Sequence, residues 1–248
     1  MIESLNVQPV AVVRSAFKEK FGIPRQPGLA NSIISTIELL PEFSSAEAVR
    51  GLEQCSHIWL VFVFSECVDK GWSPLVRPPR LGGNKKLGVF ATRSPFRPNP
   101  VGLSPVKLEA VRIEGNKVSL DVRGADLLDG TPILDIKPYL PYSDVISDAE
   151  FAVADQIKKL DLPVVYSDAA RDICIQYSQH TGENLDAQIS EILSCDPRPA
   201  YKKNDPDRVY GVKLHNLDIR WKITDNQIYI ESISYLDASE PAQKEPDL

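Results

Sequence analysis

The chain has 248 residues, 43% of them hydrophobic and 25% charged, and a formal net charge of −6 at pH 7, which is ordinary for a globular protein but argues against binding nucleic acid through net charge alone. It contains no apolar run of the ~18–20 residues that span a membrane, and its N-terminus lacks the pattern of a secretory signal. The four cysteines show no C-x-x-C spacing and no pairing with the three histidines, so we expect no metal site, no disulfide framework and a cytoplasmic location.

The first 93 residues predict strands with one short helix between them. In chain order we expect a strand at 7–14, a helix at 44–55, a strand at 57–64 and a strand at 86–93. The helix rests on Ser44 followed by Glu47, which is a capping-box pattern. The run at 57–64, HIWLVFVF, consists mostly of β-branched, aromatic and aliphatic residues and predicts a strand buried on both faces.

The next stretch continues this β pattern. Residues 106–124 alternate apolar and polar residues around Gly115-Asn116, which predicts a hairpin. Asp129-Gly130 marks a turn before a further strand at 131–140. Strands joined by long loops, without alternating helices, argue against a Rossmann sheet and predict a closed or nearly closed β-barrel.

The character of the sequence changes after about residue 145. Residues 167–194 predict two helices broken near Thr181-Gly182, and 209–224 with 227–235 predict an extended pair across Asp225-Asn226. The expected fold class is therefore mainly β, with a barrel domain followed by a small α+β domain. The expected boundaries are 1–148 for the barrel, 149–236 for the α+β domain and 237–248 for a disordered tail.

One segment of this acidic chain, residues 70–108, is basic and has no acidic residue. Its eight basic residues are Lys70, Arg77, Arg80, Lys85, Lys86, Arg93, Arg97 and Lys107. Seven prolines and five glycines lie in the same segment, which restricts its backbone at some positions and permits unusual conformations at others. A local basic surface held by such a backbone predicts a docking site for a negatively charged partner.

The loop at 91–104, ATRSPFRPNPVGLS, is the most unusual part of that segment. One interpretation is a rigid surface loop whose arginines are solvated. The alternative, which we favour, is a preorganised pocket wall in which prolines fix the backbone and arginines meet a carboxylate or phosphate. No glycine-rich dinucleotide or P-loop fingerprint occurs elsewhere, so neither of those nucleotide sites is predicted.

Several of these motifs together resemble a bacterial tRNA (adenine-N6)-methyltransferase family of the TrmO type. They are PRQPG, HIWLVFVF, RPPRLGG, GVFATRSPFRPNPVGLS, DGTPILDIKPYLPYSD and DPRPAYKK. The resemblance implies a β-barrel methyltransferase that uses S-adenosyl-L-methionine to methylate N6 of threonylcarbamoyl-adenosine, just 3′ of the tRNA anticodon. It also implies a homodimer with the cofactor near the subunit interface, and a C-terminal domain that helps to hold tRNA.

The resemblance also implies roles for individual residues. The cofactor positions carried over are Gln26, Pro27, Gly28, Ser65, Glu66, Arg93, Leu103, Arg123, Gly124, Ala125 and Asp126. At Ser65 and Glu66 the family has varied side chains, which suggests contacts through the backbone. The expected contacts to tRNA or its target base are Arg77, Arg80, Lys85, Lys86, Arg97, Asn99, Asp196, Arg198 and Tyr201. For the group around Asp196 a structural alternative stays open, namely a helix stop with a capped arginine.

Methyl transfer from a sulfonium needs alignment of the reacting atoms and an acceptor for the N6 proton, without a metal. The candidate acceptors are Asp126, Asp135 and Tyr139. Two other functions stay open from the sequence: an RNA-binding barrel without catalysis, and a methyltransferase that acts on a small anionic molecule. The first would interleave aromatic residues with the basic ones, and the basic segment has only Trp72, Phe90 and Phe96.

Overall fold

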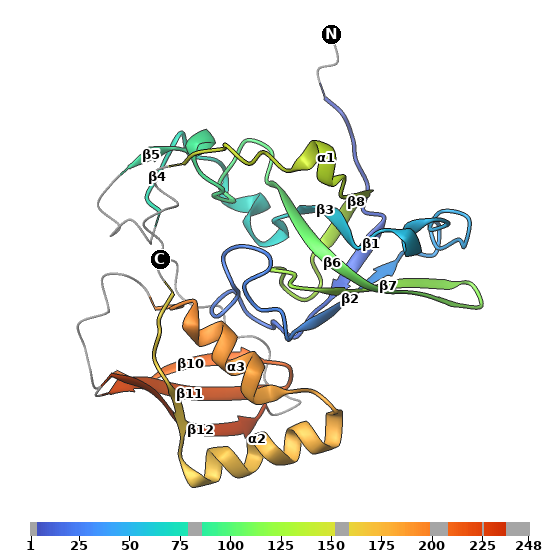
Figure 1. The fold of residues 1–248 in the computed structure, drawn as a ribbon. Helices are drawn as coiled ribbons and strands as arrows, with labels where there is room; N and C mark the ends of the chain where they lie inside the picture. Colours follow the sequence, from blue (N-terminus) through green and yellow to red (C-terminus); the bar gives the residue numbers. More distant parts are fainter. Residues whose placement is uncertain (1–3, 79–85, 152–158, 199–207, 225, 237–248) are drawn as a thin grey trace.

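The computed structural model describes residues 4–78, 86–151, 159–198, 208–224 and 226–236, which form a β-barrel and a second, α+β body (Figure 1). Within those ranges, no helix is long and apolar enough to span a membrane. The tail at 237–248 lies outside the described residues. The expected boundaries at 148 and 236 stay predictions.

Six antiparallel strands close the barrel in the order β1-β2-β7-β6-β3-β8. They are β1 (Ala11–Arg14), β2 (Ile34–Leu39), β3 (His57–Val63), β6 (Val101–Glu114), β7 (Lys117–Arg123) and β8 (Pro132–Pro138). Alternate side chains point inward, and partners such as Val13, Ile37 and Leu120 fill one shared core. The closed sheet confirms the predicted barrel, although β2 was not predicted from the sequence.

Strand β3 confirms the prediction at 57–64 but corrects its burial. Ile58, Leu60 and Phe62 are buried, while the alternating side chains Trp59 and Val61 are only partly covered. A barrel has a single inner face, so the apolar run is not buried on both faces as expected.

Two local predictions are wrong. Residues 44–55 form turns and a short 3₁₀ helix η1 (Leu52–Gln54), because the Ser44 hydroxyl donates to the Asn116 carbonyl (2.9 Å) and accepts the Val118 N–H (2.7 Å) instead of capping a helix. Within 86–93 only β5 (Leu87–Gly88) is a strand, paired with β4 (Leu75–Val76). The remaining short elements are η2 (Ser65–Lys70), η4 (Val89–Ala91) and α1 (Pro141–Asp144).

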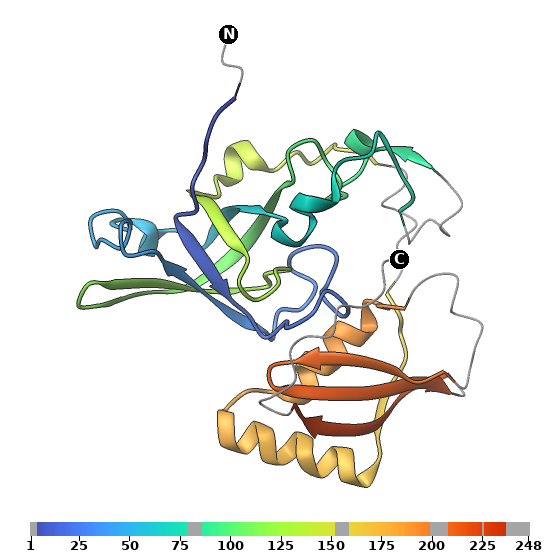
Figure 2. The same cartoon turned by 180° about the vertical axis from the view of Figure 1, so that it is seen from behind.

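The second body is a four-stranded sheet in the order β10-β11-β12-β9, with α3 crossing the face that points toward the viewer in Figure 1 and lying behind the sheet in Figure 2. Its elements are β9 (Val164–Tyr166), α2 (Asp168–Thr181), α3 (Leu185–Ser194), β10 (Tyr210–Leu214), β11 (Leu217–Thr224) and β12 (Gln227–Tyr235). The two helices confirm the predicted break, since Gly182 ends α2 at φ 77° and Asn184 caps α3. The hairpin of β11 and β12 is confirmed, whereas 209–224 contains two strands rather than one.

The two bodies share the segment at 15–33, called here the linking segment. It runs from β1 to β2 of the barrel, but Phe17, Ala30 and Ile33 are buried in the hydrophobic core of the second body. Phe17 also forms a β-bridge to Leu214 at the end of β10. The second core is therefore built partly from residues that precede β2 in the chain.

The close contact of β3 with β6 makes Gly102 a sensitive position. A Cβ at Gly102 would lie 2.2 Å from the Phe62 ring, which is buried and packed edge-to-face on Phe64 with ring centroids 5.1 Å apart. We expect Gly102→Ala to lower the free energy of unfolding in urea by about 1–3 kcal/mol, because the core has no room for the methyl group. Gly88→Ala is the control, since nothing lies within 4 Å of its Cβ position. Equal losses in both variants would contradict this packing.

Candidate functional site

The predicted cofactor loop at 26–28 lies against the turn that follows β7. The Gly28 N–H donates to the Gly124 carbonyl at 2.8 Å. Gly124 has φ 77°, and a Cβ at this position would lie 3.1 Å from the Gly28 Cα and 2.9 Å from the Asn31 side chain. Only glycine therefore allows the two segments to approach so closely.

Arg93 connects this pair of segments to the proline-rich loop. Its Nη1 donates to Gln26 Oε1 at 2.5 Å, and its positive charge favours the ionised form of Asp126. Arg93, Gln26 and Asp126 come from three segments far apart in the sequence. The barrel thus brings together an arginine, an amide and a carboxyl that the family resemblance had assigned to cofactor binding.

Asp126 is a half-buried carboxyl held by a buried serine. The Ser104 hydroxyl donates to Asp126 Oδ1 at 2.7 Å, and Ser104 itself is 2% exposed on the inner face of β6. Burial raises the pKa of Asp126, while the Ser104 hydrogen bond and the Arg93 charge oppose this rise without cancelling it. A carboxylate with a raised pKa is a better proton acceptor than an exposed one.

The other two candidate proton acceptors, Asp135 and Tyr139, lie on β8 and directly after it. Asp135 pairs in register with Val61, whose other neighbour is Leu103, so these three residues share the outer face of β8, β3 and β6. The Asp135 carboxylate binds Lys137 at 2.6 Å, and the Tyr139 ring packs against Trp59 with centroids 5.5 Å apart. The printed contacts of Asp135 and Tyr139 are therefore with residues of β8 and β3, whereas Asp126 contacts Ser104 of β6.

Arg97 binds its own loop. Its Nη1 donates to the carbonyls of Thr92 (2.7 Å) and Val89 (3.3 Å), and its guanidinium lies 5.7 Å from the centroid of the Phe90 ring. These contacts give Arg97 a structural role in shaping the loop that carries Arg93. Contact between Arg97 and tRNA stays a prediction.

The remaining predicted cofactor positions lie on β6, on β7 and the turn after it, and on η2. The Arg123 guanidinium donates to Glu109 and to the Asn31 carbonyl, both at 2.7 Å, so this side chain is already engaged. Ser65 and Glu66 begin η2 with exposed side chains, and Ala125 is buried beside the turn. Leu103 is 51% exposed on the outer face.

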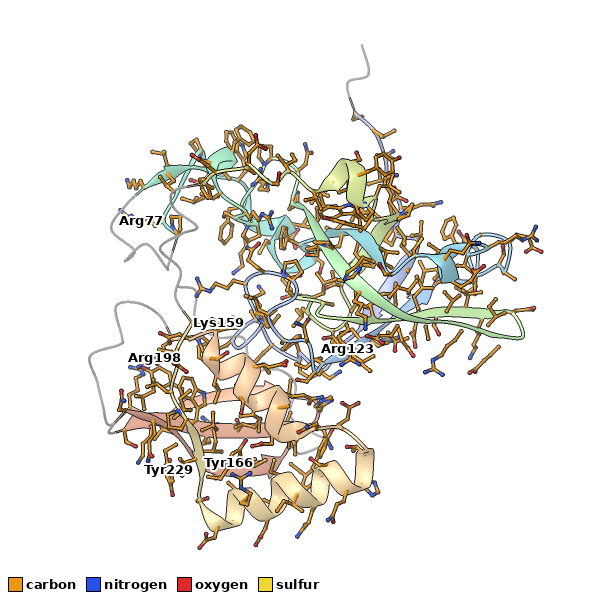
Figure 3. All side chains as sticks on the ribbon, in the orientation of Figure 1. Arg77, Arg123, Lys159, Tyr166, Arg198 and Tyr229 are labelled. Carbon is orange, nitrogen blue, oxygen red and sulfur yellow. The ribbon has the colours of Figure 1, made fainter. Side chains whose placement is uncertain are left out.

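The predicted substrate residues divide by location. Arg77, labelled in Figure 3, lies beside β4, while Lys86 just precedes β5; with Asn99 they are exposed. Arg80, Lys85 and Tyr201 lie outside the described residues.

Asp196 and Arg198 form an internal ion pair in the second body. Their closest atoms are 2.8 Å apart, and their side chains are only 9% and 11% exposed. Asp196 also adopts φ 48°, two residues after the end of α3. This arrangement agrees with the helix-stop alternative, and a contact of these residues with RNA stays a prediction.

Comparison with known proteins places the chain in a family. Residues 12–145 match the family described as tRNA-methyltransferase O N-terminal domain, and residues 159–236 match the TrmO C-terminal domain. The chain belongs to the TrmO family. Its barrel and its α+β body correspond to the two domains of that family, as the sequence motifs indicated.

Individual relatives cover nearly the whole chain. A protein of Escherichia coli K12 named tRNA (adenine(37)-N6)-methyltransferase is 43% identical over 90% of this chain and 95% of its own length. A protein of Pseudomonas aeruginosa PAO1, named putative S-adenosylmethionine-dependent methyltransferase RcsF, is 48% identical over 87% and 91%. The crystal structure of TrmO from Pseudomonas aeruginosa superimposes with a TM-score of 0.78 at 39% identity, over 94% of this chain and 100% of that one.

Sequence reasoning missed the residues that hold the site together. Ser104 ends the flagged loop and Asn31 lies three residues after Gly28, but neither was singled out. Asn31 donates to the Gly28 carbonyl at 3.0 Å and thereby closes the cofactor loop. A local signal existed for Asn31, because Asn side chains often bond the backbone of nearby turns. The partner of Ser104 is 22 residues away, and only barrel closure brings them together.

The raised pKa of Asp126 predicts a pH-dependent contribution to stability. Between the ordinary pKa and the raised folded one, the native state binds more protons than the unfolded state, so stability falls as pH rises. Asp126→Asn removes the titrating carboxyl and with it this fall in stability. The free energy of unfolding of the variant should therefore increase relative to that of wild type as pH rises from the ordinary pKa of an aspartate to the raised pKa of Asp126. Urea unfolding from pH 4 to pH 7 measures the difference, with the exposed Asp135→Asn as a control for charge. A difference that shrinks with pH would contradict the burial of Asp126.

Proposed function

We propose that this chain transfers a methyl group from S-adenosyl-L-methionine to N6 of threonylcarbamoyl-adenosine, the modified base just 3′ of the tRNA anticodon. As a member of the TrmO family the chain is a methyltransferase. The observation that carries the proposal is its 43% identity, over nine-tenths of its length, to the E. coli tRNA (adenine(37)-N6)-methyltransferase. The threonylcarbamoyl group follows from the motif resemblance.

The side chains around Gly28 and Gly124 fit such a cofactor in chemical type. S-adenosyl-L-methionine supplies an electrophilic methyl group on a sulfonium, and it carries a carboxylate, an ammonium group and an adenosine. Arg93 offers a cation for the carboxylate, Asp126 an anion for the ammonium group or a hydroxyl, and Gln26 an amide. The backbone N–H and C=O groups of Gly28 are bonded to Gly124 and Asn31, so these glycines shape the loop and the side chains supply the polar groups for the ligand.

The protein's contribution to the chemistry is mainly positioning, which can supply about 7–11 kcal/mol of the barrier in an aligned displacement. The loop at 26–28 is fixed before any ligand arrives, through Asn31, Gly124 and Arg93. Asp126, Asp135 and Tyr139 stay the candidates for accepting the N6 proton. Of the three, Asp126 interacts electrostatically with Arg93, and its raised pKa suits a proton acceptor.

The exposed basic residues near β4 and β5 are proposed to face the tRNA backbone. The target base must leave the anticodon-loop stack to react, and phosphate contacts can hold the loop while it does so.

We also propose a cytoplasmic homodimer. Large apolar side chains exposed near the proline-rich loop support a subunit contact there: Trp72, Leu75, Phe90, Val101 and Leu103.

The direct test is methylation of tRNA by the purified protein, followed by mass spectrometry of nucleosides from the anticodon loop. We expect S-adenosyl-L-methionine to add one methyl group to threonylcarbamoyl-adenosine, and cells without the protein to lack that methyl group. Binding of RNA without cofactor would favour the RNA-binding alternative. Binding of cofactor without tRNA methylation would favour a small-molecule substrate.

Arg93→Ala should weaken cofactor binding, because it removes the charge beside Gln26 and Asp126. Loss of a charged hydrogen bond costs about 1.5–3 kcal/mol, which corresponds to about tenfold to a hundredfold in affinity. Calorimetric titration with S-adenosyl-L-methionine measures the change. Arg14→Ala is the control, since Arg14 is an exposed arginine paired with Glu38 on the barrel surface. The assignment fails if both variants bind as tightly as wild type.

Charge reversal of Arg77 and Lys86 tests the tRNA-facing surface. We expect the double Glu variant to have a KM for tRNA that is about tenfold higher or more, while its cofactor affinity stays within about twofold of wild type. Its KM for tRNA should also depend less steeply on salt concentration than that of wild type. Lys117→Glu is the control, because Lys117 is exposed at the tip of the β6–β7 hairpin, far from β4 and β5 in Figure 1. Unchanged KM in the double variant would place the RNA elsewhere.

A further inference from the structure

The linking segment connects the second body directly to the cofactor loop. At its start, the His215 N–H donates to the Ala16 carbonyl at 2.7 Å, and the Lys213 N–H donates to Glu19 at 2.9 Å. In its middle, Gly22 is buried so closely against Val212 that a Cβ would lie 2.1 Å from that side chain. The strand β10 thus fixes the first half of the segment along its length.

Glu191 of α3 fixes the other half. Its Oε2 accepts both the backbone N–H of Ser32 at 2.8 Å and the Ser32 hydroxyl at 2.7 Å. The neighbouring Gln188, which is fully buried, donates from its amide nitrogen to the Ser32 carbonyl at 3.4 Å, and its amide oxygen accepts the His215 Nε2–H at 2.9 Å. Every polar group of Ser32 is therefore in contact with the second body.

The residue before Ser32 passes this constraint to the cofactor loop. Asn31 donates from its side chain to the Gly28 carbonyl and accepts the Arg123 guanidinium at its own carbonyl. Gly28 in turn donates to Gly124. A continuous series of contacts therefore runs from Glu191 through Ser32, Asn31 and Gly28 to the turn that carries Asp126.

We propose that Glu191 is a positioning residue for cofactor binding, and that the C-terminal body has a second role beside contact with tRNA: it holds the cofactor loop in its binding conformation. The inference rests on the proposed assignment of 26–28 to the cofactor. The physical reason is preorganisation, since a loop ordered in advance does not pay its conformational entropy when a ligand binds. The anchor at Ser32 lies directly beside Asn31, whose side chain closes the loop onto Gly28, so a shift at Ser32 would displace the group that holds the loop.

The test compares variants of the intact chain by calorimetric titration with S-adenosyl-L-methionine. Glu191→Ala removes both bonds to Ser32 and should weaken binding about fivefold to tenfold, the factor that one lost hydrogen bond produces. Glu191→Gln keeps an acceptor oxygen and should restore affinity to within about threefold of wild type. Asp186→Ala is the matched control, because Asp186 is a carboxylate on the same helix whose ion pair with Arg171 stays inside the second body. It should bind like wild type.

A double-variant cycle separates positioning from general loss of stability. If Glu191 acts through the loop, its effect on affinity should be much smaller in a Gln26→Ala background, where the loop has already lost its contact with Arg93. Ser32→Ala removes only the hydroxyl and serves if Glu191→Ala does not fold; it should weaken binding about twofold to threefold. Wild-type affinity in both Glu191→Ala and Ser32→Ala, or fully additive effects in the cycle, would overturn the inference. Absence of cofactor binding by the wild-type chain would instead overturn the proposed function.

Discussion

The backbone contact between Gly28 and Gly124 is the constraint on which the site depends. It joins the segment before β2 to the turn after β7 at a distance that no side chain would permit at residue 124. Because β2 and β7 are paired neighbours in the closed barrel, the two segments leave the sheet at the same end. Barrel closure therefore produces the approach, and the glycines tolerate it. The positions of Asp126 and Gln26 follow from this contact.

The two bodies are less independent than their sequence order suggests. The linking segment supplies Phe17 and Ile33 to the second core, and it also contains the predicted cofactor loop at 26–28. A segment shared in this way couples the stability of the α+β body to the geometry of the barrel site, because a shift at Ser32 changes the residue next to it. Such coupling gives a physical reason for the α+β body to be fused to this particular barrel.

Two arginines of the basic segment, Arg93 and Arg97, make different kinds of contact. Arg97 uses its guanidinium to hold the carbonyls of its own loop, whereas Arg93 on the same loop reaches across to Gln26. Prolines fix φ but remove hydrogen-bond donors, so a proline-rich loop needs side-chain donors to satisfy its carbonyls. Arg97 supplies such a donor to the Thr92 carbonyl. The loop can then present Arg93 in a defined direction.

The sequence by itself determined the features that depend on local pattern: the alternating strands, the hairpin at Gly115, the break at Gly182 and the family motifs. It failed where a side chain had a distant partner. Ser44 was predicted to cap a helix but binds the β6–β7 hairpin, and the predicted strand at 86–93 has only two residues in strand conformation. Only the tertiary structure decided that Ser104 meets Asp126 and that Glu191 holds Ser32. These two contacts join residues that are 22 and 159 positions apart in the sequence. They form because the barrel closes and the second body docks against it.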